Sequence, residues 1–337
     1  MARYVYISAA GANKIAIFTM DTGTGKLTHQ EDVSLEGPGP LALSPKGDIL
    51  YAALRSNAEI ATLRIDPASG SLTEAGKVSL QEGPAMISTD RSGRWLFGAY
   101  YGSGMISVNP IAADGVVGGP EIQRDPSAER AHYIEADATN KFVIVPHVLP
   151  GNALHVFELD ADSGRLTPAH QVTPPEGEGP RHFCFHPNQQ YIFTANEDSS
   201  TVTSYKFDNQ TGALERIQNV ANLPPEGYTP GEEPNSCSQI RITPNGRFLY
   251  APNRGHNSIA CYRVGEAGEL ATVGYVPCEN HTRGTQIDPD GKFYFTAGTK
   301  SGWMASYAIS QQTGALEPVE RIELGETPMW IEITDQD

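Results

Sequence analysis

Short apolar runs alternate with turn-forming residues along the whole chain, and the arrangement returns with a period of roughly 45 residues. Turns of the PxG type stand at 45–47, 244–246 and 289–291, and weaker copies stand at 90–93, 137–140 and 187–189. Each turn precedes an apolar run rich in aromatic and β-branched residues, such as ILYAALR or YIFTANE, which predicts a half-buried β-strand. The chain therefore consists of repeated β units.

Each unit continues with a third strand, a turn such as DADSGRL or DNQTGAL whose glycine suits a left-handed position, and a fourth strand. No useful length of helical periodicity occurs. Four antiparallel strands per unit predict the blade of an all-β propeller. The alternative, an open β solenoid, needs polar capping repeats, and neither end of the sequence resembles one.

Six units are complete, and a seventh is split between the two ends of the chain. Residues 4–28 supply only its second to fourth strands, while GETPMWIEIT at 325–334 matches the first-strand pattern GPRHFCFHP at 179–187. We therefore predict a seven-bladed β-propeller whose ring is closed by pairing of the N- and C-terminal strands.

One unit is longer than the others: 46 residues separate Gly47 from Gly93, but 57 separate Gln189 from Gly246. The extra residues form a Pro- and Gly-rich stretch, which predicts an insertion loop at about 217–237 on the rim. Residues 1–337 are expected to form one propeller domain, because repeats that share a continuous core can exceed the usual domain length.

Forty acidic residues against 24 basic ones give a formal net charge of −16. Such a charge repels nucleic acid and anionic lipid over any broad contact, so neither is expected as a partner. An anionic small molecule can still bind where several arginines cluster locally. The expected partner is therefore a small molecule, and the composition leaves the oligomeric state open.

The four cysteines show no CxxC pairing and no histidine at metal-finger spacing, so we expect free, mostly buried thiols in a reducing compartment. The first residues alternate like a strand and not like a signal peptide, and no apolar run is long enough to span a bilayer. The sequence predicts a cytoplasmic protein.

Polar residues that interrupt the repeat identify candidate site positions. Across the units, the start of the first strand mostly carries apolar or small residues, with Gln239 in one unit and Trp330 in another, and His132, His182, Arg181 and Arg283 stand out. The end of the second strand carries large or polar residues at Arg55, Tyr101, Glu197 and Arg254, with His147 one step before that position in its unit. These two strand ends lie at the same face of an antiparallel pair, so the residues are expected to converge at one mouth of the axial channel.

Three arginines with one carboxylate and two imidazoles suit the binding of a carboxylate or phosphate and the stabilisation of an oxyanion. The alternative is that these side chains only link neighbouring blades by hydrogen bonds. A metal site would draw on Glu197, Asn196 and Asn253, but the arginines oppose a divalent cation, so no metal and no cofactor are expected. Walker, Rossmann, GxSxG and HExxH motifs are absent from the sequence.

Four segments carry a resemblance that covers nearly the whole chain: GPRHFCFHPNQQYIFTANEDSSTV, ITPNGRFLYAPNRGHNSIACY, RGTQIDPDGKF and GETPMWIEI. They resemble the bacterial 6-phosphogluconolactonase family of seven-bladed propellers, which is also similar to the 3-carboxy-cis,cis-muconate lactonizing enzymes. The resemblance implies site roles for His132, Arg181, His182, Glu197, Arg254 and Arg283. One unit departs from the family pattern at FVIVPHVLPGN, which puts contacts by His147 in doubt.

The first functional hypothesis is hydrolysis of a sugar lactone such as 6-phosphogluconolactone or a related aldonolactone. Glu197, His182, His132 and Arg283 are the catalytic candidates, with Glu197 or a histidine activating water and arginine holding the oxyanion. The substrate-binding candidates are Arg181, Arg254, Arg55, His147, Tyr101 and Trp330. Two alternatives remain: a carboxymuconate-type lactonizing cycloisomerase using the same pocket, and a noncatalytic interaction propeller using its rim.

Overall fold

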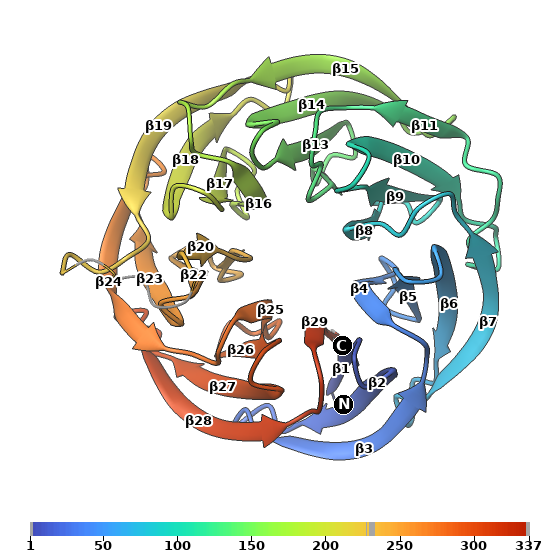
Figure 1. Ribbon diagram of the computed structural model, residues 1–337, viewed down its shortest axis with the longest axis horizontal. Helices are drawn as coiled ribbons and strands as arrows, with labels where there is room; N and C mark the ends of the chain where they lie inside the picture. Colours follow the sequence, from blue (N-terminus) through green and yellow to red (C-terminus); the bar gives the residue numbers. More distant parts are fainter. Residues whose placement is uncertain (1–2, 227, 229–232, 335–337) are drawn as a thin grey trace.

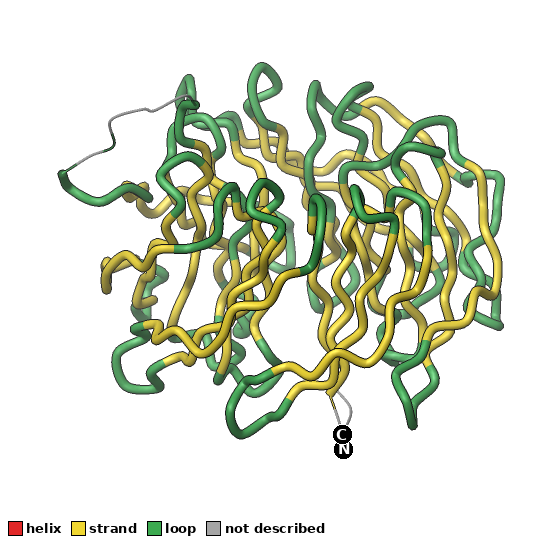
Figure 2. Tube along the Cα trace, turned by 60° about the horizontal axis from the view of Figure 1, so that its bottom comes forward, coloured by secondary structure: helices red, strands yellow, loops and turns green. Residues whose placement is uncertain are grey.

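The computed structural model describes residues 3–226, 228 and 233–334, and every regular element within them is a β-strand. The strands form seven antiparallel sheets arranged around a central axis (Figure 1). Loops gather at the two faces of the ring (Figure 2). The predicted seven-bladed β-propeller is confirmed. Within the described ranges, no helix has the length and apolarity needed to cross a lipid bilayer.

The sheets follow one another around the ring in chain order, and each runs from an innermost strand to an outermost one. The blade that joins the chain ends has β29 (Pro328–Ile333), β1 (Arg3–Ala9), β2 (Lys14–Met20) and β3 (Leu27–Ser34). Blades 1 and 2 have β4 (Pro38–Leu43), β5 (Ile49–Leu54), β6 (Glu59–Ile65), β7 (Leu72–Ser79), then β8 (Met86–Thr89), β9 (Trp95–Ala99), β10 (Met105–Pro110), β11 (Gln123–Pro126). Blades 3 and 4 have β12 (Glu135–Ala136), β13 (Phe142–His147), β14 (Ala153–Asp160), β15 (Arg165–Val172), then β16 (Pro180–Phe185), β17 (Tyr191–Asn196), β18 (Thr201–Phe207), β19 (Leu214–Ala221). Blades 5 and 6 have β20 (Ser236–Cys237) and β21 (Arg241–Ile242), β22 (Phe248–Arg254), β23 (Ser258–Val264), β24 (Leu270–Pro277), then β25 (Thr282–Ile287), β26 (Phe293–Gly298), β27 (Trp303–Ile309), β28 (Leu316–Glu323).

The ring closes through the joint blade, as the split repeat predicts. Strand β29 pairs antiparallel with β1, with Val5 opposite Ile333 and Ser8 opposite Trp330. Figure 1 shows β29 and β1 side by side in this sheet. Each sheet keeps an inner edge strand at the axis and an outer edge strand at the rim, and the mostly exposed residues of the outer strands β3 and β15 suit contact with water.

The apolar core lies between adjacent blades and is reinforced by tyrosines that reach the next blade. The hydroxyl of Tyr6 donates to the carbonyl of Gly70 at 2.9 Å, and Tyr250 donates in the same way to Gly314 at 3.0 Å. Gly70 has a φ of 74°, and a Cβ there would come within 2.3 Å of the Tyr4 ring. Glycine therefore fits these outer turns for two reasons, the positive φ and the aromatic ring beneath the turn.

The inserted stretch is shorter than predicted, because β19 continues to Ala221 and the connection to β20 covers residues 222–235. Residues 227 and 229–232 of this loop lie outside the described residues. Both ends of the connection bind Asn253, whose Oδ1 accepts from Asn222 Nδ2 and Asn235 Nδ2 at 2.9 Å each. The loop is thus attached to the end of the second strand of blade 5, next to Arg254.

Candidate active site

Strand register brings together the two sets of positions that interrupt the repeat. Pro180 pairs with Asn196 in blade 4, Ser236 pairs with Arg254 in blade 5, and Thr282 pairs with Gly298 in blade 6. The start of each inner strand therefore lies beside the end of the second strand. Because the inner strands surround the axis (Figure 1), these residues meet at one mouth of the channel, as expected.

Glu197 is held between two arginines from different blades. Its Oε2 lies 2.6 Å from Arg181 Nε and 3.1 Å from Arg254 Nη2. Arg181 is 1% exposed, so this is an ion pair within the protein interior. Burial alone would raise the pKa of Glu197, but the charges of Arg181 and Arg254 outweigh it and hold that pKa below its usual value. Glu197 is therefore a carboxylate at neutral pH and a weak base.

The two histidines lie beside this ion pair and beside each other. The rings of His132 and His182 are 5.1 Å apart, and His182 also packs on Tyr133 at 4.5 Å and Trp330 at 6.0 Å. Burial, followed by the charge of Arg181, lowers the pKa of both histidines well below its usual value. Both imidazoles are therefore uncharged at neutral pH. Neither Nδ1 atom has a hydrogen-bond partner among the residues that the structure describes.

Arg283, Arg55 and Tyr101 complete this mouth. The pKa of Arg283 is lowered to about 10, first by burial and then by the neighbouring charges of Arg55 and Arg254. The Tyr101 ring lies 5.7 Å from that of His132, and the guanidinium of Arg130 lies 5.4 Å above it. Arg130 was not predicted, because it lies outside the two repeat positions that single out the other residues. We call His132, Arg181, His182, Glu197, Arg254, Arg283, Arg55 and Tyr101 the mouth cluster.

The structure does not bring His147 into the mouth cluster, although the sequence predicted substrate contact there. Its Nε2 accepts from the backbone N–H of Ala128 at 3.2 Å, and its Nδ1 lies 3.4 Å from the carbonyl oxygen of Ala153. Its ring packs on His155 at 4.6 Å. Both ring nitrogens are thus used by backbone groups, and His147 has a structural environment.

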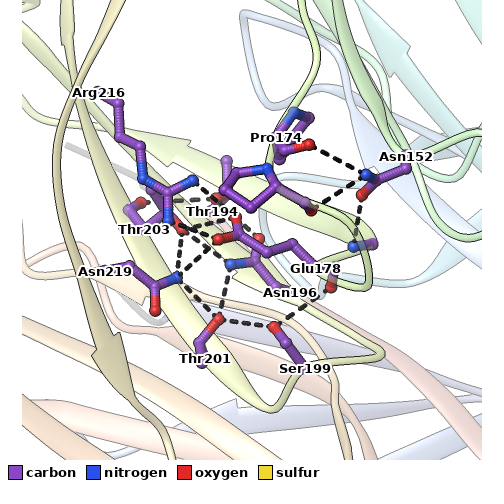
Figure 3. A network of polar contacts seen from close by, with 12 residues as sticks. Asn152, Pro174, Glu178, Thr194, Asn196, Ser199, Thr201, Thr203, Arg216 and Asn219 are labelled. Carbon is purple, nitrogen blue, oxygen red and sulfur yellow. Dashed lines mark hydrogen bonds and ion pairs between the residues drawn. The ribbon is translucent and has the colours of Figure 1, made fainter.

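A buried polar network holds the backbone that carries Glu197 (Figure 3). Arg216 binds Glu178 at 2.5 and 3.1 Å, and Thr203 links Glu178 Oε2 to the side chain of Asn196. The backbone N–H of Glu197 donates to the carbonyl of Gly179 at 2.7 Å. Glu178 therefore lies behind both Glu197 and the segment that leads to Arg181.

Glu178 was not predicted from the sequence, although a comparison of the repeats contains its signal. In blade 6 Arg321 of the outermost strand binds Glu279 at 2.5 and 3.0 Å, which is the same arrangement. Blades 4 and 6 thus share one ion pair, in which a glutamate shortly before the inner strand binds an arginine of the fourth strand.

The opposite end of the channel has a different polar composition. A cavity of about 440 Å³ there is lined by the later residues of the inner strands, with Arg241, Glu135 and Glu332 among them. Trp330 Nε1 donates to Glu332 at 2.9 Å, so Trp330 spans both ends. Burial raises the pKa of Glu332 to about 7. Arg91 binds the second carboxylate, Glu135, at 3.0 Å. We call this set the far-end cluster.

Within the described ranges, no three His, Cys, Asp or Glu side chains come together as a metal-binding group. The mouth cluster instead offers arginine donors and uncharged imidazoles. Such an arrangement binds an anionic group, stabilises an oxyanion and accepts a proton. Fold and site together define a propeller enzyme with a cationic axial site.

Comparison with known proteins identifies the family. The model of the family described as "Lactonase, 7-bladed beta-propeller" matches residues 4–333. The 6-phosphogluconolactonases of Pectobacterium carotovorum and Serratia proteamaculans are each 36% identical, over 99% of this chain and 99% of their own length. The chain belongs to the seven-bladed β-propeller lactonase family, and it is a lactone hydrolase.

Solved structures show the same fold. A Lactobacillus plantarum protein has a TM-score of 0.90 at 26% identity, covering 99% of this chain and 100% of its own. The periplasmic gluconolactonase of Pseudomonas aeruginosa also has a TM-score of 0.90, at 22% identity and 99% coverage of both chains. These likenesses extend to the whole ring.

Proposed function

We propose that this protein hydrolyses 6-phosphogluconolactone or a related aldonolactone to the corresponding sugar acid. The names of the relatives from Pectobacterium and Serratia support this substrate. The observation that carries the proposal is the mouth cluster itself, in which uncharged histidines lie among arginines in a protein of net charge −16. An anionic substrate is attracted only by such a local reversal of charge.

In the proposed reaction, water adds to the lactone carbonyl carbon and the ring C–O bond breaks. The water proton goes to the enzyme's base and then to the departing ring oxygen, so the product is a hydroxy acid. Negative charge develops on the carbonyl oxygen during the addition, and Arg254 stabilises it. Arg181 is almost fully buried against Glu197 and acts mainly by holding that carboxylate.

His132 is the base that the geometry favours. The lowered pKa values make both Glu197 and His132 weak bases, so the geometry decides between them. Two arginines bind Oε2 of Glu197, whereas His132 is neutral and its Nδ1 has no partner among the residues described. His132 also lies beside Tyr101, and the charges of Arg181, Arg283 and Arg254 all act on it. His182 packs further along the channel, between Tyr133 and Trp330, and supports the His132 ring.

The reaction is proposed to take place in the cytoplasm. The support is that all four cysteines are free thiols, with Cys184, Cys237 and Cys261 buried. Nucleic acid and membrane surfaces are not proposed as partners, because of the net negative charge.

The deciding experiment compares hydrolysis of freshly prepared 6-phosphogluconolactone and glucono-lactone with the spontaneous rate, for the wild type and Glu197→Gln. We expect acceleration by the wild type and its loss in the variant. Acceleration of neither lactone, together with ring closure of 3-carboxy-cis,cis-muconate, would replace the hydrolase by the cycloisomerase. Inactivity in all three assays would favour the noncatalytic propeller.

A further inference from the structure

The arginines of the mouth cluster form two groups that differ in their partners. Arg181 and Arg254 share Glu197 at 2.6 and 3.1 Å. Arg55 and Arg283, in contrast, make no ion pair with a carboxylate among the residues that the structure describes. The mouth therefore has one side where arginines are paired with a carboxylate and one side where Arg55 and Arg283 have no carboxylate within ion-pair distance among the described residues.

Arg55 lies over a glycine of blade 1, at a position where other blades carry a side chain. Gly39 occupies the slot that Arg181 and Arg283 occupy in blades 4 and 6. A Cβ on Gly39 would come within 2.9 Å of Arg55 Cδ, so the Arg55 stem lies directly over this glycine. Arg55 from the end of the second strand thus fills the place that an inner-strand arginine fills elsewhere.

Arg55 and Arg283 lie on the two blades that flank the joint blade, because β29 packs against both β25 and β4 and a Cβ on Gly284 would come within 3.0 Å of the Met329 carbonyl oxygen. Arg55 is the charged group that lowers the pKa of Arg283 most. Burial also lowers the pKa of Arg55, and its Nε is buried with no hydrogen-bond partner in the described ranges. Glu82 acts on Arg55 from a distance, but its carboxylate lies 3.4 Å from Arg124. Holding two partly desolvated cations together is unfavourable, and a bound anion relieves that cost.

We propose that Arg55 and Arg283 form the subsite for an anionic substituent of the substrate, a phosphate monoester carried by the sugar lactone. This rests on the proposed function. A phosphate monoester carries a charge of about −1.5 to −2 at neutral pH, which matches two uncompensated arginines better than the single charge of a carboxylate. Two planar guanidinium forks also suit its three terminal oxygens.

The subsite adjoins the proposed reaction centre. Tyr101 acts electrostatically on Arg283 and packs on His132 at 5.7 Å. The phosphate would thus be held by Arg55 and Arg283, while the lactone carbonyl lies beside His132 and Arg254. The two ends of one substrate use the two sides of the mouth.

The test measures binding of the products 6-phosphogluconate and gluconate by calorimetry, which requires no turnover. We expect the wild type to bind the phosphorylated acid at least about tenfold more tightly, the value of one charge-assisted hydrogen bond. Arg55→Gln and Arg283→Gln should each remove most of that preference. Arg91→Gln, an arginine of the far-end cluster, is the matched control and should retain it.

Parallel kinetics separate the subsite from the proposed function. The ratio of kcat/KM for 6-phosphogluconolactone to that for glucono-lactone should fall at least about tenfold in Arg55→Gln. Equal wild-type affinity for the two acids, or full preference in folded Arg55→Gln and Arg283→Gln, would overturn the subsite. Phosphate-dependent binding without turnover of either lactone would support the subsite while refuting the lactone substrate. Circular dichroism and melting temperature establish that each variant is folded, and Arg55→Lys, which keeps the charge, should restore part of the preference.

Discussion

The two ends of the axial channel contain similar residues but differ in their charge balance. At the mouth, Arg55, Arg181, Arg254 and Arg283 face one carboxylate, Glu197. In the far-end cluster, Arg91 forms an ion pair with Glu135, and Arg241 lies near the carboxyl groups of Glu332 and Glu135. Charge balance makes the far end a junction between blades, whereas excess positive charge makes the mouth a place for a ligand. Substitutions at the two ends should therefore differ in their effect on activity. The largest loss is expected for the proposed base at the mouth, and the smallest for Glu332 at the far end.

Replacing the proposed base should have the largest effect. His132→Gln removes the proton acceptor without adding charge, and kcat for lactone hydrolysis should fall roughly 100- to 10,000-fold, the usual contribution of general base catalysis. His155→Gln, a histidine bound to Ser127 and outside the mouth, is the control and should stay within about threefold of wild type. A small effect of His132→Gln would transfer the base to Glu197 or His182.

Glu178→Gln should reduce activity without touching substrate. Loss of the charge weakens the bonds to Arg216 and loosens the backbone of Glu197, so we expect a decrease of about tenfold in kcat with little change in KM. Arg216→Gln should give the same loss, and the double variant should be no worse than either, because all three break one network. Additive losses in this cycle would show that Glu178 and Arg216 act separately. Glu178→Asp, which keeps the carboxylate, should retain part of the kcat that Glu178→Gln loses. A purely structural role at a distance from the site would not predict this recovery.

The pH dependence of the reaction should reflect the uncharged histidines. Burial and arginine charges lower the pKa of His132, so the base stays unprotonated until the pH falls well below 6.5. With glucono-lactone, which does not itself titrate in this range, kcat/KM at pH 6 should remain within about twofold of its value at pH 7. An acid limb centred near pH 6.5 would show that the catalytic histidine is solvated and not held among the arginines.

The smallest effect on activity is expected at the far end. The folded-state pKa of Glu332, about 7, lies above its ordinary value of 4.5, so the folded protein keeps a proton that the unfolded chain releases. This contribution to stability is fully present below pH 4.5 and is lost as the pH rises through 7. Glu332→Gln cannot ionise, so its melting temperature relative to wild type should rise between about pH 5 and pH 8, with kcat nearly unchanged. A pH-independent difference would show that folding does not raise the pKa of Glu332. A large loss of kcat would show that the two ends of the channel are not separate.

Much of the fold and part of the site are predictable from the sequence because the repeat itself provides the comparison. Arg181, His182 and Arg283 stand out because other blades have small or apolar residues in their slots, and strand pairing then places them beside Glu197 and Arg254. The orientation of His147 was not predictable, since its ring binds the backbone of residues 128 and 153 on the other side.

Which arginines have a carboxylate partner was equally unpredictable from the sequence. Whether Arg55 has a carboxylate partner depends on residues of different blades, which are far apart in the sequence. The far-end cluster was not predicted, because Arg241 and Glu332 occupy later positions of the inner strands and not the strand ends that interrupt the repeat. Glu178, in contrast, was within reach of the sequence, since Glu279 and Arg321 repeat its pairing with Arg216.

The pairing of β29 with β1 has a consequence for biosynthesis. Trp330, which packs on His182, is carried by a strand that is translated more than 300 residues after its partner. Until that strand leaves the ribosome, β1 has an unpaired edge and the wall behind the histidines is missing. We therefore expect catalytic competence only after Pro328–Ile333 has left the ribosome, so that a nascent chain carrying every arginine of the mouth but not this strand is inactive.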